Sequence, residues 1–195
     1  MKKLIVILGF LLITVPAFAN DGLYLGAGLL VDHYSGLGPL YMVPGGNLKV
    51  GYDFGLFALE VNIMQDTHDD KLLGYGAGST GFSGTSKFNG KSIDIRIPLT
   101  STSHGKNVYG LVGVGAYTLV GPDPTIHEEV NYSGIGYNLG LGFERYMSQH
   151  IAFNLAAIYH TIRFDKKESL GITTTLSPKL SDDLLSVEIG FNYHF

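Results

Sequence analysis

The segment LSVEIGFNYHF, residues 185–195, decides the fold class because its side chains alternate in character without a break. One parity holds only large apolar or aromatic side chains, namely Leu185, Val187, Ile189, Phe191, Tyr193 and Phe195. The other parity holds only small or polar residues, namely Ser186, Glu188, Gly190, Asn192 and His194. Because successive side chains of a strand point to opposite faces, this segment predicts a β-strand with one apolar and one polar face.

Seven further segments show the same alternation with varying clarity. They are residues 22–31, 46–53, 56–65, 91–99, 107–118, 134–145 and 151–163. A tilted strand needs about 9–11 residues to cross a bilayer, and most of these segments reach that length. The sequence therefore predicts an all-β fold, an eight-stranded antiparallel transmembrane β-barrel.

The connections between these segments alternate in length. Residues 32–45, 66–90, 119–133 and 164–182 form long connections, whereas 54–55, 100–106 and 146–150 are short. Outer-membrane barrels have short periplasmic turns and longer outer loops. We therefore expect both termini on the periplasmic side and four long loops outside.

The first residues have the pattern of an export signal. Lys2 and Lys3 precede an apolar run, residues 4–15, and the segment PAFA at 16–19 has the small residues of a cleavage site. The run is shorter than the roughly 20 residues of a membrane-spanning helix. We expect residues 1–19 to be a cleaved signal peptide and residues 20–195 to form the barrel domain. Since the chain has no cysteine, a lipidated amino terminus and disulfides are excluded.

The composition agrees with a lipid-facing barrel. Charged residues make up 15% of the chain, against about 25% in soluble domains. The chain is acidic overall and offers no basic stripe, so we expect no nucleic-acid partner. A soluble lipocalin-like barrel of eight strands would show the same period with its apolar face inside. The polar character of the inward face, the export signal and the loop alternation favour the outer membrane instead.

A family resemblance adds to this interpretation. The ending GFNYHF, with Phe191, Tyr193 and Phe195 on one parity, resembles the carboxy-terminal signal of outer-membrane barrels, which the barrel-assembly machinery reads. The stretches GYDF (51–54), GVGAY (113–117) and GLGFE (140–144) resemble the OmpA-like and opacity-type eight-stranded family. The resemblance implies a Gram-negative outer membrane, with lipids and lipopolysaccharide as neighbours. It implies no single function, because this family hosts many roles.

Six charged residues fall on the inward parity of the predicted strands. They are Lys49, Glu60, Asp94, Arg96, Glu144 and Glu188. An unpaired buried charge is very costly, so we predict a network of salt bridges and hydrogen bonds among them. The network would either plug the lumen or gate a small pore by exchanging ion-pair partners.

Catalytic and metal sites are not expected. A lipid A-modifying enzyme needs a set such as Ser, His and an acid, and the best candidate is His160 with Ser169 or Glu168. Lipid A deacylases carry His and Ser two residues apart, but here Ile162 follows His160. Two clusters in predicted loops contain possible metal ligands, namely Asp66, His68, Asp69 and Asp70, and His127, Glu128 and Glu129. Their spacing matches no known metal-binding loop, so we predict no metal and no cofactor.

Three functions stay open on the sequence. The first is a non-enzymatic barrel with a structural, adhesive or surface-interaction role and an unknown extracellular partner. The second is a narrow, porin-like pore or a conduit for small hydrophobic molecules, as in the OmpW-like relatives. The third is the lipid A-modifying enzyme.

Overall fold

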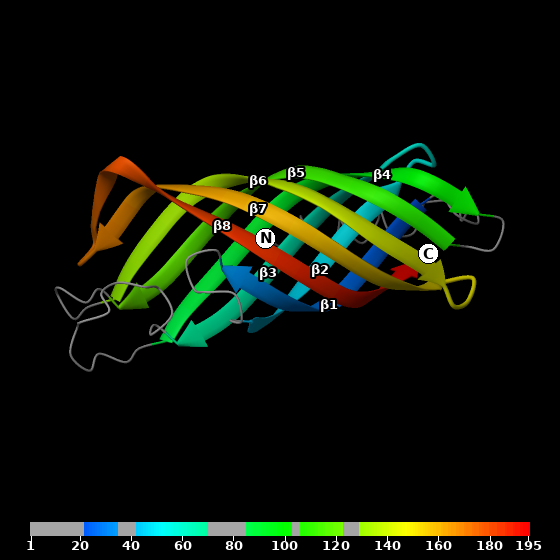
Figure 1. The fold of residues 1–195 in the computed structure, drawn as a ribbon, viewed down its shortest axis with the longest axis horizontal. Helices are drawn as coiled ribbons and strands as arrows, with labels where there is room; N and C mark the ends of the chain where they lie inside the picture. Colours follow the sequence, from blue (N-terminus) through cyan, green and yellow to red (C-terminus); the bar gives the residue numbers. More distant parts are fainter. Residues whose placement is uncertain (1–21, 35–41, 70–84, 103–105, 123–128) are drawn as a thin grey trace, which may run out of the picture.

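Eight antiparallel strands form a closed barrel in sequence order, with β8 returning to β1 (Figure 1). The computed structural model describes residues 22–34, 42–69, 85–102, 106–122 and 129–195, so the expected signal peptide lies outside the described residues. Within these ranges no helix could cross a membrane. The strands are β1 Gly22–Tyr34, β2 Val43–Asp53, β3 Ala58–Asp69, β4 Thr85–Thr102, β5 Lys106–Pro122, β6 Glu129–Tyr146, β7 Ile151–Ser169 and β8 Ile172–His194.

The ladder around the barrel is staggered. Gly28 on β1 pairs with Asn47 on β2 and with Gly190 on β8. Following the ladder from Asn47 through β3, β4, β5, β6 and β7 leads instead to Leu180 on β8. This offset along β8 means that the strands are tilted, as closure of a sheet into a barrel requires.

The apolar parity faces outward on every strand. Large apolar side chains are exposed around the whole circumference, for example Leu29, Leu48, Val61, Ile93, Val112, Leu139, Leu155 and Ile189. A continuous belt of this kind is unstable in water and stable against lipid. The orientation agrees with the predicted outer-membrane barrel and excludes the soluble lipocalin-like alternative, which would bury this face.

The prediction of a long loop at residues 164–182 is wrong. β7 continues to Ser169 and β8 begins at Ile172, joined by a tight turn at Leu170 and Gly171 whose φ angles are 53° and 73°. Such paired positive φ angles suit a two-residue hairpin. In Figure 1 this orange-to-red hairpin extends past the rest of the barrel at the left of the view. The apolar alternation disappears here because both faces of the hairpin are exposed, as at Lys166 and Thr174.

The other expected long connections are shorter than predicted because the strands extend into them. What separates those strands, residues 35–41, 70–84 and 123–128, lies outside the described residues. Two expected short turns are present. The backbone N–H of Phe54 donates to the carbonyl of Phe57 (2.9 Å), and that of Met147 to Ile151 (2.8 Å). We call the end of the barrel with these turns and His194 the terminal end, and the opposite end the hairpin end.

Glycines inside the barrel make room for large aromatic side chains. Gly142 lies directly across the ladder from Tyr109. A Cβ atom added at Gly142 would stand 2.6 Å from Tyr109 Cε2, which is closer than such contacts occur. The pairing of a bulky residue with a glycine lets the ring lie across the narrow interior.

We expect Gly142→Ala to destabilise the folded barrel by about 1–3 kcal/mol, because the added methyl group overlaps the Tyr109 ring. The matched control is Gly110→Ala on the neighbouring strand, where the nearest atoms to an added Cβ are 3.9 Å away on Leu99. Urea titration followed by far-UV circular dichroism in detergent measures both. Equal losses in the two variants would contradict this account of the interior glycines.

Candidate functional site

All six charged residues predicted to face inward lie inside the barrel. They come from β2 (Lys49), β3 (Glu60), β4 (Asp94 and Arg96), β6 (Glu144) and β8 (Glu188), and none is more than 7% exposed. Charges removed from water to this degree need partners of opposite sign or hydrogen bonds.

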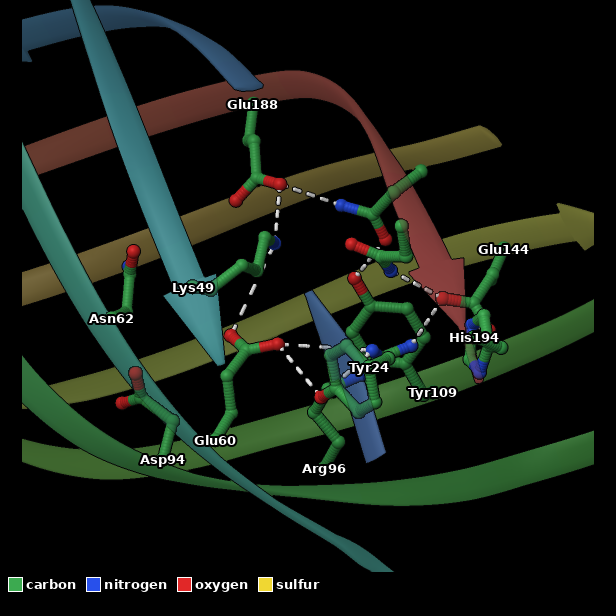
Figure 2. Close-up of polar contacts among 12 residues, drawn as sticks. Tyr24, Lys49, Glu60, Asn62, Asp94, Arg96, Tyr109, Glu144, Glu188 and His194 are labelled. Carbon is green, nitrogen blue, oxygen red and sulfur yellow. Dashed lines mark hydrogen bonds and ion pairs between the residues drawn. The ribbon is translucent and has the colours of Figure 1, made fainter. Parts of the chain in front are cut away.

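Five of the six form one continuous series of ion pairs, which we call the ion-pair chain. Lys49 pairs with Glu188 and lies 4.0 Å from Glu60 Oε1. Arg96 lies 3.1 Å from Glu144 Oε2 through Nη2 and 3.7 Å from Glu60 Oε2 through Nη1. Glu60 therefore lies between the two cations and joins them (Figure 2). The ion-pair chain crosses the interior from β8 through β2, β3 and β4 to β6.

Asparagine amides satisfy the two terminal carboxylates of the ion-pair chain. Asn47 and Asn154 donate to Glu188 at 2.9 and 2.7 Å. Asn192 donates to Glu144 at 2.6 Å. Since hydrogen bonds to a charged group are the stronger kind, these neutral donors stabilise the carboxylates without adding charge.

Two tyrosines enclose the Arg96 guanidinium. Its central carbon lies 4.0 Å from the ring centre of Tyr109 and 5.4 Å from that of Tyr24. The Tyr24 hydroxyl donates to Glu60 (2.9 Å) and accepts from Arg96 (3.2 Å). The ring of His194 stacks on Tyr24 at 5.2 Å. A planar guanidinium suits such a site because it stacks on rings and bonds carboxylates at its edges.

Asp94 is the one predicted charge that lies outside the ion-pair chain. Its carboxylate accepts hydrogen bonds from Ser92 (2.5 Å) and from Asn138 (2.8 Å). Asn138 Oδ1 in turn accepts from the Tyr117 hydroxyl at 2.5 Å and lies 2.9 Å from His160 Nδ1. The interior thus holds a second, hydrogen-bonded cluster beside the ion pairs.

The uncharged members of these clusters were not predicted as site residues from the sequence. Tyr24 and Tyr109 sit on the inward parity directly across from glycines, Gly51 and Gly142. An aromatic residue opposite a glycine marks a side chain that lies across the lumen. That signal needs the strand register, which the sequence alone does not supply.

The interior toward the hairpin end is apolar, contrary to the expected small or polar inward face. We call these buried residues the apolar cluster: Leu30, Tyr34, Val43, Met64, Phe88, Tyr117, Leu119, Ile162, Phe164 and Leu184. Several of them fall in segments predicted to be loops. The described interior is therefore mainly ionic toward the terminal end and mainly apolar toward the hairpin end.

The structure does not assemble the hydrolytic set considered for this chain. His160 is 2% exposed, and its Nδ1 lies 3.2 Å from the Tyr117 hydroxyl. Ser169 and Glu168 lie farther along β7, about 25–30 Å away at roughly 3.3 Å per residue. No group of three or more potential metal ligands of the His, Cys, Asp or Glu type occurs among the described residues. Asp70, His127 and Glu128 lie outside them.

The residues of the expected carboxy-terminal signal lie on the outside of the barrel, on β8 and directly after it. Phe191, Tyr193 and Phe195 are 53%, 46% and 43% exposed. The Tyr193 ring lies 5.1 Å from that of Phe195 and 5.7 Å from that of His150. These aromatic side chains are therefore free to meet lipid or another protein at the terminal end.

With the closed barrel and its lipid-facing belt established, the family follows. Residues 5–195 match the outer membrane protein beta-barrel domain. The chain belongs to this family. It is an OmpA-like barrel of the bacterial outer membrane. A comparison with curated proteins found no match.

Solved outer-membrane barrels share its fold. Neisserial surface protein A is similar with a TM-score of 0.64 and 11% identity over 89% of this chain and 97% of that chain. The attachment invasion locus protein Ail of Yersinia pestis has a TM-score of 0.56 and 15% identity over 90% of this chain and 99% of that chain. OprG of Pseudomonas aeruginosa has a TM-score of 0.54 and 16% identity over 90% of this chain and 95% of that chain. At such identities the likeness shows the fold alone.

We expect Arg96→Met to destabilise the barrel by about 3–5 kcal/mol, because Glu60 and Glu144 would keep buried charges without their cation. Arg145→Met is the matched control, since Arg145 follows Glu144 on β6 but is exposed. Urea unfolding in detergent gives both values. If the free energy of unfolding falls no more in Arg96→Met than in Arg145→Met, the ion-pair chain does not stabilise the fold.

Proposed function

We propose that the lumen of this barrel is closed and that the protein acts through its surface, in a structural, adhesive or surface-interaction role. The observation that carries the proposal is the ion-pair chain, Glu188–Lys49–Glu60–Arg96–Glu144, whose members are all buried. A passing solute would have to separate these charges. Because separation leaves buried charges unpaired at several kcal/mol each, the closed state is favoured over a gated pore.

We expect the purified protein to show no resolved conductance steps in planar lipid bilayers. Arg96→Ala, which removes one cation and shortens the side chain, tests whether the ion-pair chain acts as a gate. The proposal requires that the wild type stay silent. A stable open channel in the wild type, abolished or altered in Arg96→Ala, would instead establish the gate.

We infer that the terminal end faces the periplasm and the hairpin end the cell exterior. The short turns at the terminal end and the long β7–β8 hairpin opposite support this orientation. Lys87 and Lys91 also support it, because both are exposed on β4 just beyond the outward apolar residue Ile93. Basic side chains at that level suit the phosphates of lipopolysaccharide.

Labelling of whole cells tests the orientation directly. The chain has no cysteine, so Leu170→Cys at the β7–β8 turn and Ser148→Cys at the β6–β7 turn each introduce a single thiol. We expect a membrane-impermeant maleimide to label the position-170 variant in intact cells and the position-148 variant only after lysis. The reverse pattern would invert the proposed topology.

The hairpin supports a role at the cell surface. Leu170 and Ile172 at its tip are 74% and 66% exposed, although they lie beyond the apolar belt. Apolar side chains held out in water favour contact with a partner. The names of two structural neighbours, a surface protein and an attachment invasion locus protein, are consistent with this role.

A conduit for small hydrophobic molecules is the second candidate. The apolar cluster at the hairpin end is the observation that favours it, because its side chains could receive an apolar solute. Uptake of a small hydrophobic dye into proteoliposomes, absent in protein-free vesicles, would support this function over the first. We infer no enzymatic role, since Ser169 and Glu168 lie far along β7 from His160. During biogenesis we propose that Phe191, Tyr193 and Phe195 are read by the barrel-assembly machinery.

A further inference from the structure

Two carboxylates lie together inside the barrel, apart from the ion-pair chain. Asp32 on β1 is 0% exposed and Asp66 on β3 is 2% exposed. Gly45 on the intervening β2 borders both, since a Cβ atom added there would stand 3.0 Å from Asp66 Cβ and 3.3 Å from Asp32 Oδ2. The two side chains are therefore close neighbours across β2. The Tyr34 hydroxyl donates a hydrogen bond to Asp66.

Asp32 lacks a well-formed hydrogen bond. Neither of its carboxylate oxygens has one of good geometry among the described residues, although Ser186 and Asp66 are its immediate neighbours. Ser186, which pairs directly with Asp32 across the β1–β8 ladder, is 1% exposed, and its Oγ has none of good geometry there either. A direct ladder partner on the same face brings the two side chains to about 5 Å at Cβ. The Ser186 hydroxyl is therefore directed toward the carboxylates.

Positive charge is scarce inside the described part of the barrel. The buried carboxylates are Asp32, Glu60, Asp66, Asp94, Glu144 and Glu188, whereas Lys49 and Arg96 are the buried Lys and Arg residues there. Both of these cations already pair with members of the ion-pair chain. Since an uncompensated buried carboxylate is very costly, Asp32 must either hold a proton or receive a positive charge from elsewhere.

We propose that Asp32 and Asp66 bind one divalent metal cation of the calcium type, with the Ser186 hydroxyl as a neutral oxygen ligand. The side chains gathered here offer oxygen atoms, which are the ligands that hard cations prefer. Two carboxylates match the double charge. Only two acidic side chains contribute, so backbone carbonyls or water complete the coordination, as is common for such ions. The sequence analysis assigned Asp66 to a loop cluster and therefore predicted no metal.

A hollow beside β2 and β3 adjoins the proposed site. It has a volume of about 400 Å³ and is lined by Pro44, Gly45, Gly46, Gln65, Asp66 and Thr67. The two glycines leave the wall without side chains at this point, and Asp66 belongs both to the hollow and to the buried pair. The hollow therefore lies next to the proposed site and away from the ion-pair chain.

Terbium luminescence tests the proposal on the full chain folded in detergent at neutral pH. Tb³⁺ takes the place of Ca²⁺, and Tyr34 beside Asp66 is positioned to sensitise it. We expect saturable binding that Ca²⁺ displaces. Asp32→Asn should weaken the affinity by about tenfold or more, because it halves the ligand charge, and Ser186→Ala by less. Asp94→Asn is the matched control, since Asp94 is buried but satisfied by Ser92 and Asn138.

A second readout keeps the proposal falsifiable if Asp32→Asn folds poorly. Ca²⁺ should raise the thermal unfolding temperature of the wild type relative to EDTA, and the rise should be smaller in Ser186→Ala. Binding that is unchanged in Asp32→Asn, or weakened equally in Asp94→Asn, would overturn the site. Absence of any binding to the wild type would overturn it too and leave a proton shared by the two carboxylates. None of these outcomes depends on whether the lumen conducts.

Discussion

The pairing of buried charges inside a narrow barrel is the constraint on which the rest of the structure depends. Lys49 and Arg96 come from two strands, and the carboxylates that neutralise them come from three others. A shift of one residue in any of these strands would turn its charge toward lipid and its apolar side chains inward. The ion pairs and the lipid-facing belt therefore require the same register, and each reinforces the other.

The same constraint explains the division of the interior. Ion pairs and amides fill the lumen toward the terminal end, where the wall is surrounded by the apolar belt. Farther along, the interior is filled by the apolar cluster, and the outer faces of β4 and β7 become polar. Part of this cluster lies at the level of the belt, as at Leu30 between the exposed Leu29 and Val31, and the rest lies beyond it. The barrel interior is thus mainly ionic toward the terminal end and mainly apolar, with a few buried polar side chains, toward the hairpin end.

Sequence reasoning succeeded where lipid imposes a contrast between the two faces of a strand. Ile135 and Leu139 alternate with Gly136 and Asn138 because one set meets lipid and the other the lumen. The contrast disappears outside the membrane, which is why residues 164–169 and 172–182 were predicted to be loop. Parity alone identified the inward charges, but their partners depend on register. For the same reason Asp66 was taken for a loop residue and its proximity to Asp32 was not foreseen.

The closed lumen that we propose is the central claim, and hydrogen exchange at arginine tests it most directly. The chain has three arginines, of which Arg96 is buried in the ion-pair chain and Arg145 and Arg163 are exposed. Nuclear magnetic resonance in lipid nanodiscs can follow the guanidinium protons of each after transfer to deuterated water. The account predicts that exchange at Arg96 is far slower than at the other two. Exchange at Arg96 as fast as at Arg163 would mean that water fills the lumen, and would contradict it.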